Sequence, residues 1–184
     1  MPIIVVGGAN KGVGKTSLIC ALIAAFPQFS WTAVKVTTDH YGQREPVSEE
    51  IMKPPATQAE KGTDTARYLA AGARRAILVT ASTAGLPIVD IRAALGQDTN
   101  VIFESNTIIN SLNPDLCLAI VGRSYLDSKS SFEPLMQKAD ALVFSTGSTE
   151  RLNFVPSVPQ FALSARDSVS DEMLAWLRLR LGTT

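Results

Sequence analysis

The sequence predicts a three-layer α/β fold, in which helices cover both faces of a mainly parallel sheet of about seven strands. Two observations predict it. The runs expected to form strands are continuously apolar, as in a sheet that is covered on both faces. These runs alternate along the chain with segments of helical pattern, which is typical of parallel strands joined by helices. The expected strands span residues 3–6, 31–37, 76–80, 101–104, 116–121, 141–144 and 160–163.

The helices between these strands are expected at residues 17–26, 65–72, 86–95 and 170–181. The first of them is apolar around its whole circumference and stops before Pro27, so we expect it to be largely buried. The third has Pro87 in its first turn and Gly96 at its end, the positions that these two residues favour.

Composition narrows the class of protein. The chain has 184 residues, 46% of them hydrophobic and 18% charged, which fits a single domain over residues 1–184. The charges of the 17 basic and 17 acidic residues cancel, so non-specific electrostatic binding of nucleic acid is not expected. No apolar stretch reaches the roughly 18 residues that span a membrane. The N-terminus shows no targeting pattern. We therefore expect a soluble cytoplasmic protein.

One segment departs from the alternating pattern. Residues 40–64 are polar and contain Pro46, Pro54 and Pro55. A loop of that length without secondary structure is uncommon in a compact domain and is usually either functional or disordered. The sequence leaves two interpretations open, a lid over a ligand site and a flexible insertion.

The most specific motif is the stretch GGANKGVGKTS at residues 7–17. It follows the first expected strand directly and opens the first expected helix, which is the context of a phosphate-binding loop, or P-loop. Ala9 stands where the strict form of the motif has a glycine. The sequence therefore predicts a P-loop NTPase that binds GTP or ATP.

Each P-loop residue has an expected role. Gly12 and Gly14 let the backbone curl so that its N–H groups point at phosphate oxygens, and the helix N-terminus adds further donors. Lys15 is expected to contact the β- and γ-phosphates, and the Thr16 hydroxyl to bind Mg²⁺. The predicted nucleotide-binding residues are Asn10, Lys11, Gly12, Val13, Gly14, Lys15, Thr16 and Ser17. For Lys11, solvation or a γ-phosphate contact is favoured over contact with a partner subunit's nucleotide.

Two carboxylates are candidates for the Mg²⁺ and catalytic site. Ligands of open α/β sheets bind at the carboxyl ends of the strands, where Glu104 and Asp39 end or follow an apolar run. Glu104 could hold Mg²⁺ through water or orient a nucleophile, and Asp39 is the competing Mg²⁺ ligand. A strand-end salt bridge is the structural alternative for each. With Lys15, they form the predicted catalytic set.

Weaker signals concern the rest of the ligand. Arg123 and Lys129 could bind an anionic substrate or simply be solvated. Residues 164–166, Ser-Ala-Arg, resemble the S-A-K motif that contacts guanine, but residues 145–147 do not continue as the N-K-x-D that makes guanine recognition specific. GTP is thus only weakly favoured over ATP.

In combination, several motifs resemble the molybdopterin-guanine dinucleotide biosynthesis protein B (MobB) family. They are the P-loop, the stretch at residues 62–73 and the Glu-ended strand at residues 101–104, and they cover about the first 105 residues. The resemblance implies Asp64 and Arg67 as site residues. It also implies a GTP-binding accessory protein of molybdenum cofactor maturation. The chain departs from the family in having Glu104-Ser105 in place of E-G, and in a reduced histidine-rich segment around His40.

Three functions remain open. The first is a MobB-like protein that hydrolyses GTP slowly and assists a cofactor-assembly partner, and it could form a homodimer. The second is a P-loop small-molecule kinase that phosphorylates an acceptor held by Arg123 and residues 40–64. The third is an interaction module whose bound nucleotide only changes the conformation of that segment. One P-loop scaffold can serve all three.

Overall fold

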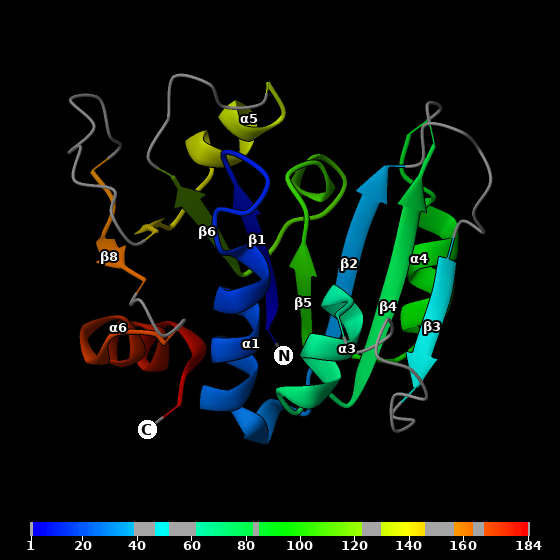
Figure 1. The fold of residues 1–184 in the computed structure, drawn as a ribbon, viewed down its shortest axis with the longest axis horizontal. Coiled ribbons are helices and arrows are strands. Elements are labelled where there is room, and N and C mark those ends of the chain that lie inside the picture. The colour runs from blue at the N-terminus through cyan, green and yellow to red at the C-terminus, as the bar shows by residue number, and fades with distance from the viewer. Residues whose placement is uncertain are drawn as a thin grey trace.

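In the computed structural model, residues 2–38, 47–51, 62–82, 85–122, 130–145, 157–163 and 168–183 are described. Within these residues the strands form one eight-stranded sheet in the order β3-β4-β2-β5-β1-β6-β7-β8 (Figure 1). The strands are β1 Ile3–Gly8, β2 Thr32–Thr38, β3 Val47–Ile51, β4 Arg75–Ala81, β5 Val101–Glu104, β6 Leu116–Val121, β7 Ala141–Phe144 and β8 Gln160–Ala162.

The parallel part of the sheet is as predicted. Each pairing other than that between β3 and β4 is parallel, so the seven expected strands form one parallel array. The chain crosses from β1 past β5 to β2, and later from β5 past β1 to β6. The β1 and β5 strands are therefore central, and their carboxyl ends lie side by side. The predicted α/β class with a mainly parallel sheet is confirmed.

One strand was not expected. Val47–Ile51 lies inside the polar segment 40–64 and forms β3, which pairs antiparallel with β4 at the edge of the sheet. An edge strand needs ladder hydrogen bonds on one side only, and charged residues are common there. The absence of an apolar run therefore did not exclude a strand. Residues 40–46 and 52–61 lie outside the described residues, so the lid and the flexible insertion both stay predictions.

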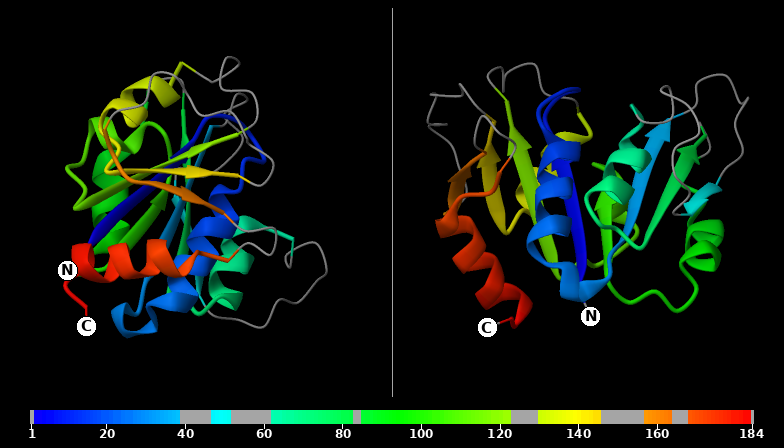
Figure 2. Two further views of the ribbon diagram at one scale, coloured as in Figure 1. Left: turned by 90° about the vertical axis from the view of Figure 1, so that its left-hand side faces the viewer. Right: turned by 60° about the horizontal axis from the view of Figure 1, so that its bottom comes forward.

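The helices cover both faces of the sheet (Figure 2). Buried residues of α1 and α3 pack with α6 on one face, and those of α4 and α5 pack on the other. The helices are α1 Lys15–Ala25, α3 Asp64–Ala70, α4 Ile88–Leu95, α5 Phe132–Gln137 and α6 Asp171–Leu181, with 3-10 turns at Pro27–Phe29 and Ile108–Asn110. The short α5 helix has no counterpart among the expected helices.

The continuous hydrophobicity of the strands follows from these two layers. In β1, Ile4 and Val6 face the α1 side while Val5 faces the α5 side, and all three are fully buried. All six residues of β6 are buried in the same alternating way. Each side chain of a strand that is covered on both faces must be apolar, because successive residues point to opposite faces.

The last helix is fixed at both ends by local interactions. The Ser170 hydroxyl accepts a hydrogen bond from the Met173 N–H at 3.2 Å, and Gly182 ends the helix in the left-handed conformation. Acidic residues lie in the first turn and arginines in the last, which complements the helix dipole. Leu177 is fully buried against the sheet, whereas Leu179 of the same helix is 84% exposed.

These two leucines form a matched pair for testing the packing of α6. Leu177→Ala should lower the free energy of unfolding by about 2–5 kcal/mol, because it leaves a cavity beneath the helix. Leu179→Ala should change it by less than about 0.5 kcal/mol. Urea unfolding of the two variants measures both values. Equal effects would contradict the placement of α6.

Candidate functional site

The loop between β1 and α1 lies at the carboxyl end of the central strand. Gly12 and Gly14 adopt φ angles of 78° and 102°. This left-handed conformation strains residues that carry a Cβ atom, so only glycine accepts it without cost. The loop therefore curls at the two glycines for which the sequence predicts that role.

Neighbouring strands hold the start of this loop. The Gly8 N–H donates to Asn106 Oδ1 at 2.8 Å, and Asn106 Nδ2 donates to the Gly8 carbonyl at 3.1 Å. On the other side, the Ala9 N–H donates to the Ile120 carbonyl at 3.0 Å. Asn106 thus pairs with the Gly8 backbone as a strand residue would, and it extends the β5–β1 ladder to the base of the loop.

The helix that follows begins without a capping side chain. Gly14 is the N-cap residue of α1, and no side chain accepts a hydrogen bond there. The first N–H groups of a helix have no partners within the helix, and they favour an anion. Lys15 folds back over the loop and donates from Nζ to the Asn10 carbonyl at 3.0 Å. Backbone donors and an ammonium therefore lie on one short loop, while Lys11 is exposed.

Thr16 brings two carboxylates to the start of α1. Its Oγ1 lies 2.8 Å from Asp64 Oδ1 and 2.9 Å from Glu104 Oε2, so its hydroxyl hydrogen can be donated to either carboxylate. Asp64 opens α3 and Glu104 ends β5. Glu104 is only 2% exposed, although it is an acidic residue at the end of a strand. Three elements far apart in the sequence thus place oxygen atoms around one point.

Lys35 and Tyr68 complete the surroundings of Glu104. The Lys35 ammonium lies 2.9 Å from Asp64 Oδ2 and also pairs with Glu104 Oε1. The Tyr68 hydroxyl donates to Glu104 Oε2. The buried carboxylate therefore has a cation and two hydroxyl donors as partners, as burial of a charge requires.

The pKa values of this cluster reflect the same contacts. Burial opposes the charge on Lys35, but the Glu104 and Asp64 carboxylates outweigh it and raise the lysine pKa. Partial burial would raise the pKa of Asp64, yet the hydrogen bonds from Lys35 and Thr16 lower it. Burial and the neighbouring Glu104 raise the pKa of Tyr68, so its phenol stays protonated as a donor. Lys35 and Asp64 are therefore charged at neutral pH.

The structure brings together some of the predicted residues and not others. Lys15 and Thr16 lie on the P-loop, and Glu104 contacts Thr16 directly. Asp64, which the family resemblance implies, joins them, and Arg67 donates to Ser17 Oγ at 3.1 Å. Val13 is buried and its side chain belongs to the core on the α1 side of the sheet. Asp39, His40, Arg123, Lys129 and residues 164–166 lie outside the described residues.

Sequence reasoning missed Lys35 and Tyr68. A signal for Lys35 was present, because a lysine in the middle of the apolar run WTAVKVT must have a partner if the strand is buried. Tyr68 offered no such signal, since a tyrosine in an amphipathic helix is ordinarily a core residue. Its role depends on the packing of α3 against the sheet.

The oxygen atoms around Thr16 suit a magnesium ion. Mg²⁺ prefers oxygen ligands and is commonly held by one or two carboxylates together with water and substrate phosphates. Thr16, Glu104 and Asp64 supply a hydroxyl and two carboxylates of this kind. Across the part of the chain that the structure describes, no group of three His, Cys, Asp or Glu side chains could hold a metal ion. Thr16, Glu104 and Asp64 therefore suit a Mg²⁺ ion whose other ligands are water and phosphate oxygens.

Comparison with solved structures gives the fold. LpxK from Aquifex aeolicus, solved in complex with ATP, matches with a TM-score of 0.57 at 16% identity, over 100% of this chain and 69% of that one. The chain therefore shares its fold with LpxK. HypB from Helicobacter pylori, solved in complex with nickel, matches with a TM-score of 0.46 at 14% identity, over 97% of this chain and 84% of that one. No protein-family model and no curated protein sequence matches the chain.

The described helices were also compared with the length of a membrane span. None of them is both long enough and apolar enough to cross a bilayer.

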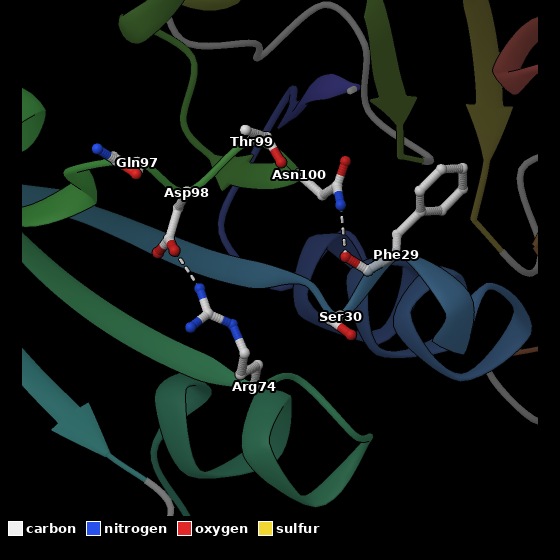
Figure 3. Close-up of a pocket in the computed structure, with 7 residues that line it drawn as sticks. All are labelled: Phe29, Ser30, Arg74, Gln97, Asp98, Thr99 and Asn100. Carbon is white, nitrogen blue, oxygen red and sulfur yellow. Dashed lines mark hydrogen bonds and ion pairs between the residues drawn. The ribbon is translucent and has the colours of Figure 1, made fainter.

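A cavity of about 180 Å³ lies at the opposite end of the sheet from the P-loop (Figure 3). Its side chains precede or begin β2, β4 and β5, and they include Asp98, which pairs with Arg74 and with Arg75 Nη1, the latter at 2.6 Å. Asp98 also accepts a hydrogen bond from Thr32 Oγ1 at 2.7 Å. The cavity is lined by Phe29, Ser30, Arg74, Gln97, Asp98, Thr99 and Asn100. Because Asp98 is already bound to these groups, it ties the beginnings of the strands together.

The Asp98 cluster should make stability depend on pH. Burial would raise the pKa of Asp98, but Thr32 and the two arginines lower it. A lowered pKa stabilises the fold above the unfolded value of about 3.9, and this contribution is lost as the pH falls through the native pKa. Asp98→Asn should therefore cost about 1.5 kcal/mol at neutral pH.

Urea unfolding at several pH values measures this difference, which should shrink toward about pH 2. Asp90→Asn, on the exposed side of α4, is the matched control and should change stability by less than about 0.5 kcal/mol. A cost for Asp98→Asn that is the same at all pH values would contradict the assignment.

Proposed function

We propose that the protein binds a nucleoside triphosphate together with Mg²⁺ at the P-loop and hydrolyses it slowly. One observation carries the proposal. The Thr16 hydroxyl, directly after the P-loop lysine, contacts both Asp64 and Glu104. A phosphate-binding loop and a set of oxygen ligands for Mg²⁺ therefore meet at the same helix terminus.

The phosphate contacts follow from the loop. Its curled backbone, the uncapped start of α1 and the Lys15 ammonium supply donors that favour the β- and γ-phosphates. Lys15 now bonds the Asn10 carbonyl, and a phosphate oxygen would be a stronger acceptor for the same ammonium. LpxK, which shares the fold, was solved with ATP, and this supports a nucleotide as the ligand.

The residues that would hold Mg²⁺ are Thr16, Glu104 and Asp64. When bound, the ion supplies neutralisation of the charge on the β- and γ-phosphates. Thr16 lies in the first turn of α1 and Glu104 at the end of β5, so the two central strands of the sheet fix both. Asp39, which the sequence predicts as the alternative ligand, remains a candidate.

Glu104 is the proposed catalytic carboxylate. In hydrolysis, the oxygen of a water molecule bonds to the γ-phosphorus, the bond from that phosphorus to the leaving oxygen breaks, and the water proton passes to a base or to a phosphate oxygen. Glu104 is held by Lys35, Tyr68 and Thr16, so its oxygens keep one orientation. A fixed carboxylate at this place suits the positioning of such a water.

The identity of the nucleobase and the biological role of the protein are proposed from the sequence alone. The preference for GTP comes from residues 164–166, and the role as an accessory protein of molybdenum cofactor maturation, with a partner protein and a homodimer, comes from the MobB resemblance. Titration with Mg-GTP and with Mg-ATP, followed by a phosphate-release assay without any acceptor, tests the proposal. Phosphate release supports hydrolysis, whereas binding without release would favour a kinase or an interaction module.

Lys15→Ala tests the phosphate site. Charge-assisted bonds to the phosphates are worth up to about 3 kcal/mol, so we expect the Kd for Mg-nucleotide to rise by about 100-fold or more. Lys138→Ala removes an exposed lysine on the other face of the sheet and should leave the Kd unchanged. Calorimetry measures both variants. Wild-type affinity in Lys15→Ala, with the fold intact by circular dichroism, would refute the phosphate site.

Glu104→Gln separates chemistry from binding. Glutamine keeps the shape of the side chain but lacks the carboxylate charge, and its amide nitrogen replaces one of the two oxygens that accept from Lys35 and Tyr68. We expect the rate of phosphate release to fall by about 100-fold, while the Kd for nucleotide changes by only a few fold. Single-turnover assays and calorimetry give the two values. An equal loss of binding and turnover would assign Glu104 another role.

A further inference from the structure

Lys35 lies beside Glu104 because of the register of two neighbouring strands, β2 and β5. The two residues are direct partners in the parallel β2–β5 pair. Neighbouring strands lie about 4.8 Å apart, and both side chains leave the face that α1 and α3 cover, since each contacts Asp64 or Tyr68 of α3. The position of the ammonium is therefore set by the sheet rather than by a loop.

The ammonium and the Thr16 hydroxyl divide the four carboxylate oxygens between them. Lys35 contacts Asp64 Oδ2 at 2.9 Å and pairs with Glu104 Oε1. Thr16 Oγ1 contacts the remaining two oxygens, Asp64 Oδ1 at 2.8 Å and Glu104 Oε2 at 2.9 Å. Lys35 thus spans the same pair of carboxylates that would attract a cation to Thr16.

We infer that Lys35 is a positioning residue that holds Glu104 and Asp64 together in the nucleotide-free protein and prevents a divalent cation from binding there before the nucleotide does. The inference rests on the proposed function, because it concerns the same Mg²⁺. Lys35 offsets one of the two carboxylate charges, so its removal would leave their surroundings one unit more negative. Repulsion by the nearby ammonium opposes a divalent ion, and the phosphates of the nucleotide supply the missing negative charge.

A purely structural ion pair would have a different consequence. Glu104 is buried, and a lysine that only neutralised it would matter for stability alone. If Lys35 competes with the cation, its removal must also strengthen cation binding by the nucleotide-free protein. Cation affinity, rather than stability or turnover, therefore separates the two roles.

The experiment measures the binding of Mn²⁺ alone, by electron paramagnetic resonance, to the full chain without nucleotide. Lys35→Met keeps the apolar stem and removes the charge, and we expect it to lower the Kd for Mn²⁺ by about tenfold or more. Lys35→Arg keeps the charge and should bind Mn²⁺ as the wild type does. Lys138→Met removes the same charge from the surface near α5 and should also leave the Kd unchanged.

An Mn²⁺ affinity in Lys35→Met that equals that of the wild type would overturn the inference, as would an equal gain in Lys35→Arg. If Lys35→Met does not fold, Lys35→Met/Glu104→Gln avoids the unpaired buried charge and is compared with Glu104→Gln alone. The double variant should bind Mn²⁺ more tightly, because Asp64 has then lost its ammonium, and equal affinities would refute the inference. Failure of the proposed function is seen separately, as absence of Mg-nucleotide binding by the wild type.

Discussion

The burial of Glu104 is the constraint on which the site depends. A carboxylate taken out of water must have a cation or several donors as partners, and here a lysine, a threonine and a tyrosine meet that need. They come from β2, α1 and α3, so the requirement of one side chain fixes how three elements meet. The contact between Thr16 and Glu104 also fixes the first turn of α1, and with it the P-loop.

The strand order explains why this contact is available. Because β1 lies between β5 and β6, the chain that leaves β1 enters α1 directly beside the end of β5. Glu104 is the last residue of β5 and pairs with Val6 of β1, two residues before that strand ends. The carboxylate therefore sits beneath the P-loop. In sheets of this kind, ligands bind where the connections from neighbouring strands run to opposite sides.

Much of this fold could be predicted from the sequence, because most of the seven parallel strands are largely apolar runs. Val47–Ile51 could not, since an edge strand does not need such a run and its pairing with β4 forms through tertiary contact. The six residues of α5 could not either, because their burial depends on β1 and β6 rather than on a long periodic pattern.

The residues of the candidate site also fall into two groups, those that the local sequence predicts and those that it does not. Lys15, Thr16 and Glu104 could be found from a motif and from the end of a strand, since local sequence places them. Tyr68 could not, because its role arises only when the packing of α3 brings it to Glu104. Lys35 gave a signal as a lysine within an apolar run, but its partner depends on the register of β2 and β5. Asp64 was reached only through a family resemblance, since a helix-opening aspartate is more often a residue that favours the helix dipole.

The charges of the cluster bear on how the proposed nucleotide site would attract a polyanion although the chain has no formal net charge. Lys15 and Lys35 formally offset Asp64 and Glu104, and Arg67 adds a further positive group beside Asp64. The direction of the donors would add to the attraction for phosphate, because the uncapped helix start and the curled loop present backbone N–H groups. Such donors act only at short range, so they favour a ligand that fits the loop over an extended polyanion. In the proposed function, Lys35 opposes a divalent ion at the carboxylates until phosphate arrives with it, so metal and nucleotide binding would be interdependent.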